Sequence, residues 1–336
     1  MKKIILATLA AASLVACAKE EIVVAPKGEA IAFDNAFVDN TTKAIDPSVT
    51  TKTLKKFVVY GTTKGDEQNA PVINIFNGVL VEGSVTEVDV NGDATAQNWA
   101  YAPNYTQYWI DGNFYAFAAV ANGTVTPDAN GMPKTISYNS ENQKDLLYAK
   151  NTSYAPYLKV SSNKTVAFTF NHLLSKVKFT FKNESPVGGY NYVVTDLKIA
   201  GVGKNATCDV VNFPTSYTWA ITDTTTAEFG HIVAATAEEV TAAINVVPGS
   251  SGVSNYERLV VPQDYTALTV SCRIATMING KEADVETYIK PVSVNLEGGN
   301  AYNFVLSRKL DDKIQFSVVK VNEWVENPAQ YTENNN

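Results

Sequence analysis

Short runs of alternating apolar and polar residues fill the chain from residue 28 onward, and they limit its possible folds more than any other feature. The runs are rich in Val, Thr, Tyr and Phe, which favour strands over helices. The pair Asn279-Gly280 separates two such runs, as in a two-residue hairpin. The pattern predicts an all-β fold, with one helix expected at residues 236–244 from the capping-box pair Thr236 and Glu239.

Two of the expected strands change the parity of their apolar positions. In residues 164–182 the apolar positions are even through Leu174 and odd from Val177 onward. One extra residue in the strand would return all of them to one buried face, so a β-bulge is predicted near Ser175. A similar change of parity predicts a second bulge beside Val318.

Residues 1–16 have a short basic start and an apolar run that is too short to span a membrane as a helix, which predicts a signal peptide. Residues 14–17 resemble a bacterial lipobox, so Cys17 is expected to carry acyl chains such as palmitate and to anchor the chain in the outer membrane. An ordinary secretory leader with an incidental cysteine is the alternative. Lys19-Glu20-Glu21 resembles a surface-export tag, although a solvated tether would look the same.

The charge balance and the scarcity of reactive side chains exclude several functions. The chain has 27 basic and 34 acidic residues, a net charge of -7, which leaves no positive field for nucleic acid. It has only two His and three Cys, and no nucleophile elbow, phosphate loop or zinc-protease motif. The calcium-like segment Asp89-Val90-Asn91-Gly92-Asp93 has Ala100 where a calcium loop needs Glu, and a hairpin turn is favoured. No catalytic residue, metal or cofactor is therefore expected.

Three other groups of residues have a structural and a functional interpretation. His172 shares parity with buried strand positions, which favours a strand residue with one hydrogen bond. Cys208 and Cys272 lie on apolar faces, and a disulfide between them stays open. Tyr105, Tyr108 and Trp109 could stack on sugars, but core and rim positions are more common for such residues.

A set of short segments follows Cys17 along the chain. They are Ile31-Ala32-Phe33, Thr42-Lys43-Ala44, the run 54–61, Trp99-Ala100-Tyr101, Tyr115-Ala116-Phe117, Asp145-Leu146-Leu147-Tyr148-Ala149, the run 170–179, Leu259-Val260-Val261-Pro262-Gln263, the run 298–306 and Val321-Asn322-Glu323-Trp324. In this order and spacing the chain resembles the fimbrillin-like proteins of Bacteroidota, the pilins and accessory subunits of type V pili. The resemblance covers nearly all of residues 17–328.

The resemblance implies two tandem transthyretin-like β-sandwich domains with antiparallel sheets and Greek-key connections. A more polar stretch ends near residue 163, where we expect the domain boundary. The expected organisation is a signal peptide at 1–16, a tether at 17–29, an N-terminal domain at 30–163 and a C-terminal domain at 164–336.

The resemblance also implies assembly by strand exchange. In polymerising members a protease removes the N-terminal strand at a Thr-Arg-Ala-like site, and the C-terminal strand of the next subunit fills the groove. A subunit that lacks one strand exposes backbone groups and an apolar trough, and a neighbour's strand satisfies both. The N-terminal candidate has Ile31, Phe33 and Phe37 on one face. The donor candidate is the segment 314–325, with Ile314, Phe316, Val318, Val321 and Trp324. An ordinary intramolecular strand remains the alternative for both.

The expected cleavage site departs from the family's pattern, because Lys43 precedes Ala44 where an Arg is expected. Either a Lys-tolerant protease cuts between these two residues, or the subunit is never trimmed and keeps its lipid.

The function expected from the sequence is that of a surface-exposed fimbrial subunit or accessory component, lipid-anchored in the outer membrane, which mediates cell adhesion. Its expected partners are other pilus subunits and host or bacterial surface ligands, but not nucleic acid. The alternative is a monomeric surface lipoprotein that binds glycans through Tyr105, Tyr108 and Trp109.

Overall fold

Strands make up most of the chain in the computed structural model, which describes residues 28–38, 54–88, 94–156, 165–222, 226–230, 243–253, 258–309 and 314–321. Cys17, Lys43, Ala44 and Trp324 lie outside these residues, as do the calcium-like segment 89–93 and most of the helix expected at 236–244. The helices of the described part are two single 3-10 turns, η1 (Pro103–Tyr105) and η2 (Ser140–Asn142). No helix within these ranges could cross a membrane. The all-β prediction is confirmed.

The first sheet has seven strands in the order β1-β9-β8-β5-β2-β3-β4. They are β1 (Ala32–Val38), β2 (Lys56–Lys64), β3 (Ile73–Val88), β4 (Ala94–Ala100), β5 (Phe114–Ala121), β8 (Leu147–Pro156) and β9 (Thr165–His172). All neighbours in this sheet are antiparallel except β1 and β9, which run parallel. β1 and β4 are therefore its two edge strands.

The seven-stranded sheet curls until its two edges approach each other. Residues of β1 and β4 come within 8 Å between Cα atoms, although no backbone ladder joins the two strands. The curl encloses aromatic side chains from most of the strands, including Phe57, Phe76, Phe117 and Phe168. These four aromatic side chains thus lie inside the curl, and β1 closes the opening between β9 and β4.

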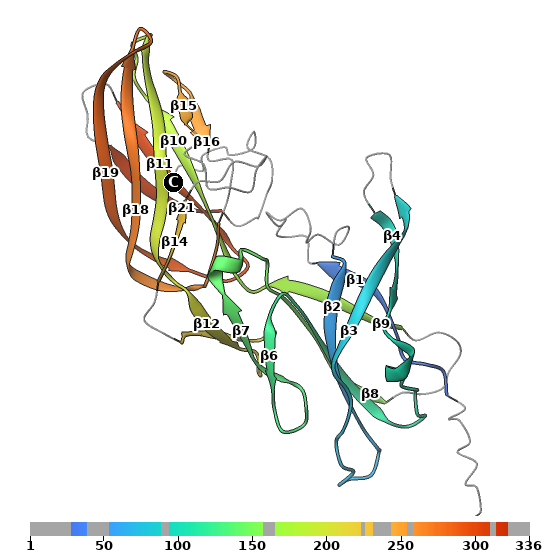
Figure 1. Ribbon diagram of the computed structural model, residues 1–336. Coiled ribbons are helices and arrows are strands. Elements are labelled where there is room, and N and C mark those ends of the chain that lie inside the picture. Colours follow the sequence, from blue (N-terminus) through green and yellow to red (C-terminus); the bar gives the residue numbers. More distant parts are fainter. Residues whose placement is uncertain are drawn as a thin grey trace, which may run out of the picture.

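A small four-stranded sheet covers part of the outer side of the first sheet, in the order β13-β12-β7-β6. Its strands are β6 (Thr124–Pro127), β7 (Pro133–Asn139), β12 (Asn205–Asp209) and β13 (Thr218–Ile221). Its side chains Ile136 and Cys208 belong to the same buried cluster as Tyr148 of β8. Figure 1 shows β6, β7 and β12 between the strands of the first sheet and the long strands of the C-terminal half.

The C-terminal half is a sandwich of two further sheets around a second core. One sheet contains β10 (Ser175–Asn183), β16 (Ser251–Val253), β17 (Arg258–Val260), β20 (Ala301–Arg308) and β21 (Gln315–Val321). The other contains β11 (Tyr190–Gly203), β14 (Thr226–Gly230), β15 (Ile244–Val246), β18 (Gln263–Ile278) and β19 (Lys281–Leu296). Phe179 and Phe304 from the first of these sheets meet Val194 and Ile274 from the second in one buried cluster. Neighbouring strands are antiparallel except β10 and β20.

Both predicted bulges are wrong. Residues 164–182 form two strands, because β9 lies in the seven-stranded sheet and β10 begins three residues later in a sheet of the sandwich. The change of parity marks the step from the first core to the second. β21 pairs with β20 without any register shift, and Val319 is exposed instead of turning inward.

The first core extends past the boundary expected at residue 163. β9 follows that residue and pairs with β1 and β8, so it belongs to the seven-stranded sheet. Consecutive buried residues change cores between Leu174 and Val177. β12 and β13 also return to the first core from the C-terminal half of the sequence.

The hairpin predicted at Asn279-Gly280 is confirmed. Both residues have positive φ, 50° and 78°, and they join β18 to β19. A side chain at Gly280 would meet nothing within 4 Å, so conformation alone favours glycine there.

Candidate functional site: two edge strands

β1 is held by backbone hydrogen bonds on two sides. It pairs in parallel with β9, with Phe33 opposite Val166. Just before it, the amide of Ile31 donates to the carbonyl of Gln107 at 2.8 Å, and the amide of Trp109 donates to the carbonyl of Glu29 at 2.9 Å. The N-terminal strand is thus bound to the rest of the first sheet by pairing at its start and along its length.

The side chains of Ile31 and Phe33 fix β1 in the first core. They are 1% and 3% exposed, and the Tyr101 hydroxyl donates to the Ile31 carbonyl at 2.6 Å. The Phe33 ring meets four aromatic rings with centroid distances of 5.4 to 6.2 Å, those of Phe76, Tyr101, Phe117 and Phe168. Burying two such side chains stabilises the strand by roughly 3–6 kcal/mol. Without β1, these rings would line an open apolar trough.

Phe37, the third residue expected on this face, lies in β1 opposite Thr169. The register of β1 against β9 shifts between Asp34 and Phe37. The regular alternation assumed from the sequence is therefore interrupted in the second half of the strand.

The donor candidate, β21, is also an edge strand, but it is less deeply buried. It pairs with β20 from Gln315 opposite Ser307 to Val321 opposite Ala301. Ile314, Phe316 and Val318 pack against the second core while remaining half-buried. Phe316 meets the ring of Phe304 at 5.8 Å.

Asp145 and His172 form a buried pair that sequence reasoning missed. The Asp145 Oδ2 and His172 Nδ1 atoms are 2.5 Å apart, and both side chains are buried. Next to them, the amide of Leu173 donates to the carbonyl of Leu146 at 3.0 Å. The pair joins two of the segments that carry the family resemblance, residues 145–149 and 170–179. The presence of an Asp in one segment and a His in the other was the only indication of this contact in the sequence.

The aromatic stretch considered for glycan binding is split between surface and core. Tyr105 and Tyr108 are exposed, whereas Trp109 is 8% exposed and its ring meets those of Tyr115 and Phe117. Trp109 is therefore a core residue and offers no stacking surface. The core position that the sequence favoured is confirmed for Trp109, and the alternative, a sugar-stacking surface, lacks its largest ring.

Cys208 and Cys272 are both free and buried, and they belong to different cores. The sequence did not decide whether these two cysteines form a disulfide, and in the structure they do not. Burial raises the pKa of each thiol to about 12. The described residues include no group of three or more His, Cys, Asp or Glu that could hold a metal ion.

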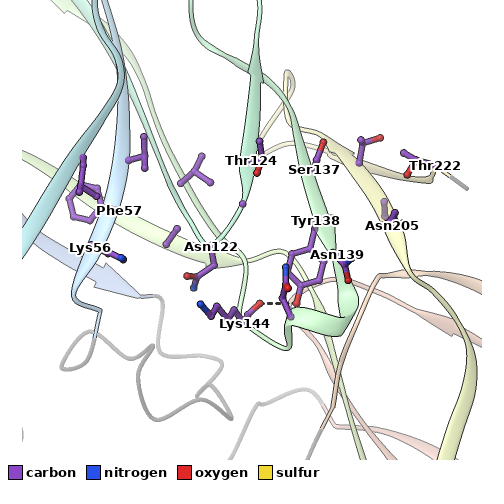
Figure 2. Close-up of a pocket in the computed structure, with 18 residues that line it drawn as sticks. Lys56, Phe57, Asn122, Thr124, Ser137, Tyr138, Asn139, Lys144, Asn205 and Thr222 are labelled. Carbon is purple, nitrogen blue, oxygen red and sulfur yellow. Dashed lines mark hydrogen bonds between the residues drawn. The ribbon is translucent and has the colours of Figure 1, made fainter. Parts of the chain in front are cut away.

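A polar groove of about 660 Å³ lies where the seven-stranded sheet meets the four-stranded sheet. Its walls come from the start of β2, the end of β5, β7 and β12, and Figure 2 shows their side chains. Most of the polar groups are neutral amides and hydroxyls, and the two charged ones are Lys56 and Lys144. In the described structure β1, β4 and β21 are edge strands of their sheets.

Comparison with known proteins identifies the family. The model of the fimbrillin-like family matches residues 42–324, and the chain belongs to that family. Its members are structural and adhesion proteins, not enzymes. No curated protein matches the sequence.

Several solved structures resemble this chain. A fimbrial protein from Bacteroides vulgatus has 15% identity and a TM-score of 0.57, covering 88% of this chain and 99% of its own. A fimbrial assembly protein from Parabacteroides distasonis has 12% identity and a TM-score of 0.40, covering 86% of this chain and 96% of its own. The fimbrial anchor protein Mfa2 from Porphyromonas gingivalis has 12% identity and a TM-score of 0.36, covering 87% of this chain and 96% of its own. The TM-score of the first structure shows that the two chains share a fold.

Proposed function

We propose that this chain is a surface-exposed fimbrial subunit or accessory component that assembles by strand exchange and contributes to cell adhesion. The observation that carries the proposal is the position of β1, an edge strand that closes the curled first sheet with two buried side chains. Its partners would be other pilus subunits, together with ligands on host or bacterial surfaces.

The acceptor site is the place that β1 occupies. Removing β1 would leave unpaired the backbone groups of β9 that face it and would expose the rings that surround Phe33. A long, apolar, unpaired strand edge is strongly prone to pair with another strand. A strand from a second subunit would restore both the backbone pairing and the apolar contacts.

The donor is β21 with the residues that follow it. An edge strand with half-buried side chains can leave its sheet at a smaller loss than a fully buried strand. In the proposal, Ile314, Phe316 and Val318, followed by Val321 and Trp324, enter the acceptor site of the next subunit.

Processing and anchoring involve Cys17 and the Lys43–Ala44 bond. That bond lies between β1 and β2 in the chain, so cleavage there would separate β1 from the rest of the subunit without cutting any described strand. A subunit cut there polymerises, whereas an uncut subunit keeps the lipid on Cys17 and serves as an anchor or other accessory component.

The N-terminus of the chain recovered from sheared surface fibres separates these two forms. A start at Ala44 is expected for a polymerising subunit, and a lipidated Cys17 is expected for an anchoring one. A Lys43→Gln variant serves as the matched control, since it removes the basic side chain that the protease would recognise while leaving the sequences of β1 and β2 unchanged. Chains that begin at neither residue would contradict the proposed processing.

Truncation tests the donor strand. A chain that stops after Asp312 lacks β21 and should form no detergent-resistant oligomers. A chain that stops after Val325 retains the donor segment and is the matched control. Oligomers of equal size and yield from both chains would refute donation by β21.

A further inference from the structure

The polar groove between the first sheet and the four-stranded sheet has a charge opposite to that of the chain as a whole. Lys56 and Lys144 are exposed at its wall, and no Asp or Glu lines it. Glu82 is opposite Lys56 in the strand register, but no ion pair joins them in the described structure. The chain carries a net charge of -7, so a positively charged groove on it favours an acidic ligand.

The remaining groups of the groove fit an extended peptide. Asn122, Asn139 and Asn142 offer amides, while Thr124 and Ser137 offer hydroxyls. Both aromatic side chains of the wall, Phe57 and Tyr138, are buried, so neither presents a ring face on which a sugar could stack. Figure 2 shows the polar side chains along both sides of the groove.

The groove lies at the end of the sheet where β1 finishes. Val38 is opposite Phe170, and His172, two residues further along β9, is opposite Leu147. Tyr148 is opposite Val120, which in turn is opposite Val58. Val120 and Val58 both line the groove, so the C-terminal end of β1 and the groove share one end of the sheet.

The segment that follows the donor strand 314–325 has the complementary charge. Residues 326–336 contain Glu326 and Glu333 and no Lys or Arg. A donor strand that runs in the direction of β1 would bring this segment out at the groove end of the acceptor. Fully extended, it reaches roughly 36 Å, whereas three strand spacings from β1 to β5 come to roughly 14 Å.

We propose that the acidic segment 326–336 of one subunit docks in the polar groove of the next, with its glutamates near Lys56 and Lys144. The inference rests on the proposed strand exchange and names a second contact of the same donor. This contact fixes the direction of the donor strand. It also adds a salt-sensitive ionic interaction to the apolar contacts between the donor strand and the acceptor site.

Intermolecular cross-linking of full-length chains, folded and then cut between Lys43 and Ala44 so that β1 can leave its place, tests the inference. All variants carry Cys17→Ala, so the native thiols are Cys208 and Cys272, which are buried. A chain with Lys144→Cys is mixed with a chain with Ala329→Cys, oxidised and analysed by mass. The matched control is Lys134→Cys, an exposed lysine of β7 that does not line the groove.

A disulfide between the two copies is expected with Lys144→Cys and not with Lys134→Cys. Adding Lys56→Glu to the Lys144→Cys chain should lower the yield roughly fivefold, because an attraction becomes a repulsion. The inference would be overturned if no cross-link formed, or if Lys134→Cys gave an equal yield. It would also be overturned if a Lys144→Cys/Ala329→Cys double variant formed the cross-link only within single copies.

The same samples separate this inference from strand exchange. Detergent-resistant oligomers without the Lys144→Cys cross-link would overturn the docking of the segment and leave strand exchange standing. The other outcome is a cross-link between copies that persists when residues 314–321 are deleted and no such oligomers form. It would support the docking contact and overturn strand exchange.

Discussion

Replacing Phe33 by Ala tests whether β1 is the strand that closes the first core. The substitution removes a ring that is 3% exposed and that meets the rings of Phe76, Tyr101, Phe117 and Phe168. The backbone pairing of β1 with β9 stays possible, so the change acts through packing alone.

Truncation of a buried Phe to Ala lowers the free energy of unfolding by about 3–5 kcal/mol, through lost burial and the cavity that remains. The lower end of that range applies if the free edge lets β1 shift to fill the space. Urea unfolding followed by tryptophan fluorescence suits the measurement, since Trp109 packs in the same core. The same variant should also speed the formation of oligomers, because β1 leaves its place more easily.

Ile73→Ala is the matched control, since Ile73 is an apolar strand residue of the same sheet that is 54% exposed. It should change the free energy of unfolding by less than about 0.5 kcal/mol. A loss below about 1 kcal/mol for Phe33→Ala would refute the reasoning, because a well-packed core position cannot lose a ring at so small a cost.

Three further predictions follow from buried groups and backbone conformation. Asp145→Ala should lower the free energy of unfolding by about 1–3 kcal/mol, because it removes one partner of a buried hydrogen bond. Glu141→Gln, which breaks an exposed pair with Lys204, should lower it by less than about 1 kcal/mol, and equal losses in urea unfolding would contradict the role of burial. Burial raises the pKa of Cys208 and Cys272 to about 12 from the ordinary 9.0, so the unfolded state loses these thiol protons at a lower pH than the folded state does. The free energy of unfolding should therefore fall as the pH rises from 9.0 toward 12, by about 1.4 kcal/mol per pH unit for each thiol. Urea midpoints across that pH range should fall less steeply in a Cys208→Ala/Cys272→Ala variant, and an unchanged slope would count against it. Gly280→Ala should lower stability by only about 1–2 kcal/mol, since its φ is +78° and the space is open. Gly201→Ala should lower it more in thermal melts, because its φ is +87° and a Cβ there would lie 3.0 Å from the backbone oxygen of Ala267.

Local pattern predicted much of the fold. Alternating runs gave the strand content, and the hairpin at Asn279-Gly280 followed from the positive φ that both residues adopt. Ile31 and Phe33 were expected on one face of an N-terminal strand, and both are buried. Such features depend on near neighbours in the chain, so the sequence alone was enough.

Long-range pairing was not predictable in the same way. The residues around Ser175 were predicted to form one bulged strand, but they form the two strands β9 and β10. A local pattern shows that the buried face changes, but it does not show which core each face contacts. The edge position of β1 and its parallel pairing with β9 depend on the whole sheet. The contact of Asp145 with His172 depends on two segments that lie 27 residues apart.

The sequence by itself determined that this chain is an all-β member of the fimbrillin-like family with little material for catalysis. The tertiary structure alone decided that β1 closes a curled sheet, that Trp109 belongs to the core, and that Lys56 and Lys144 share one groove. The physical reason is that alternation is encoded residue by residue. Edges, seams and grooves exist only where distant strands have packed together.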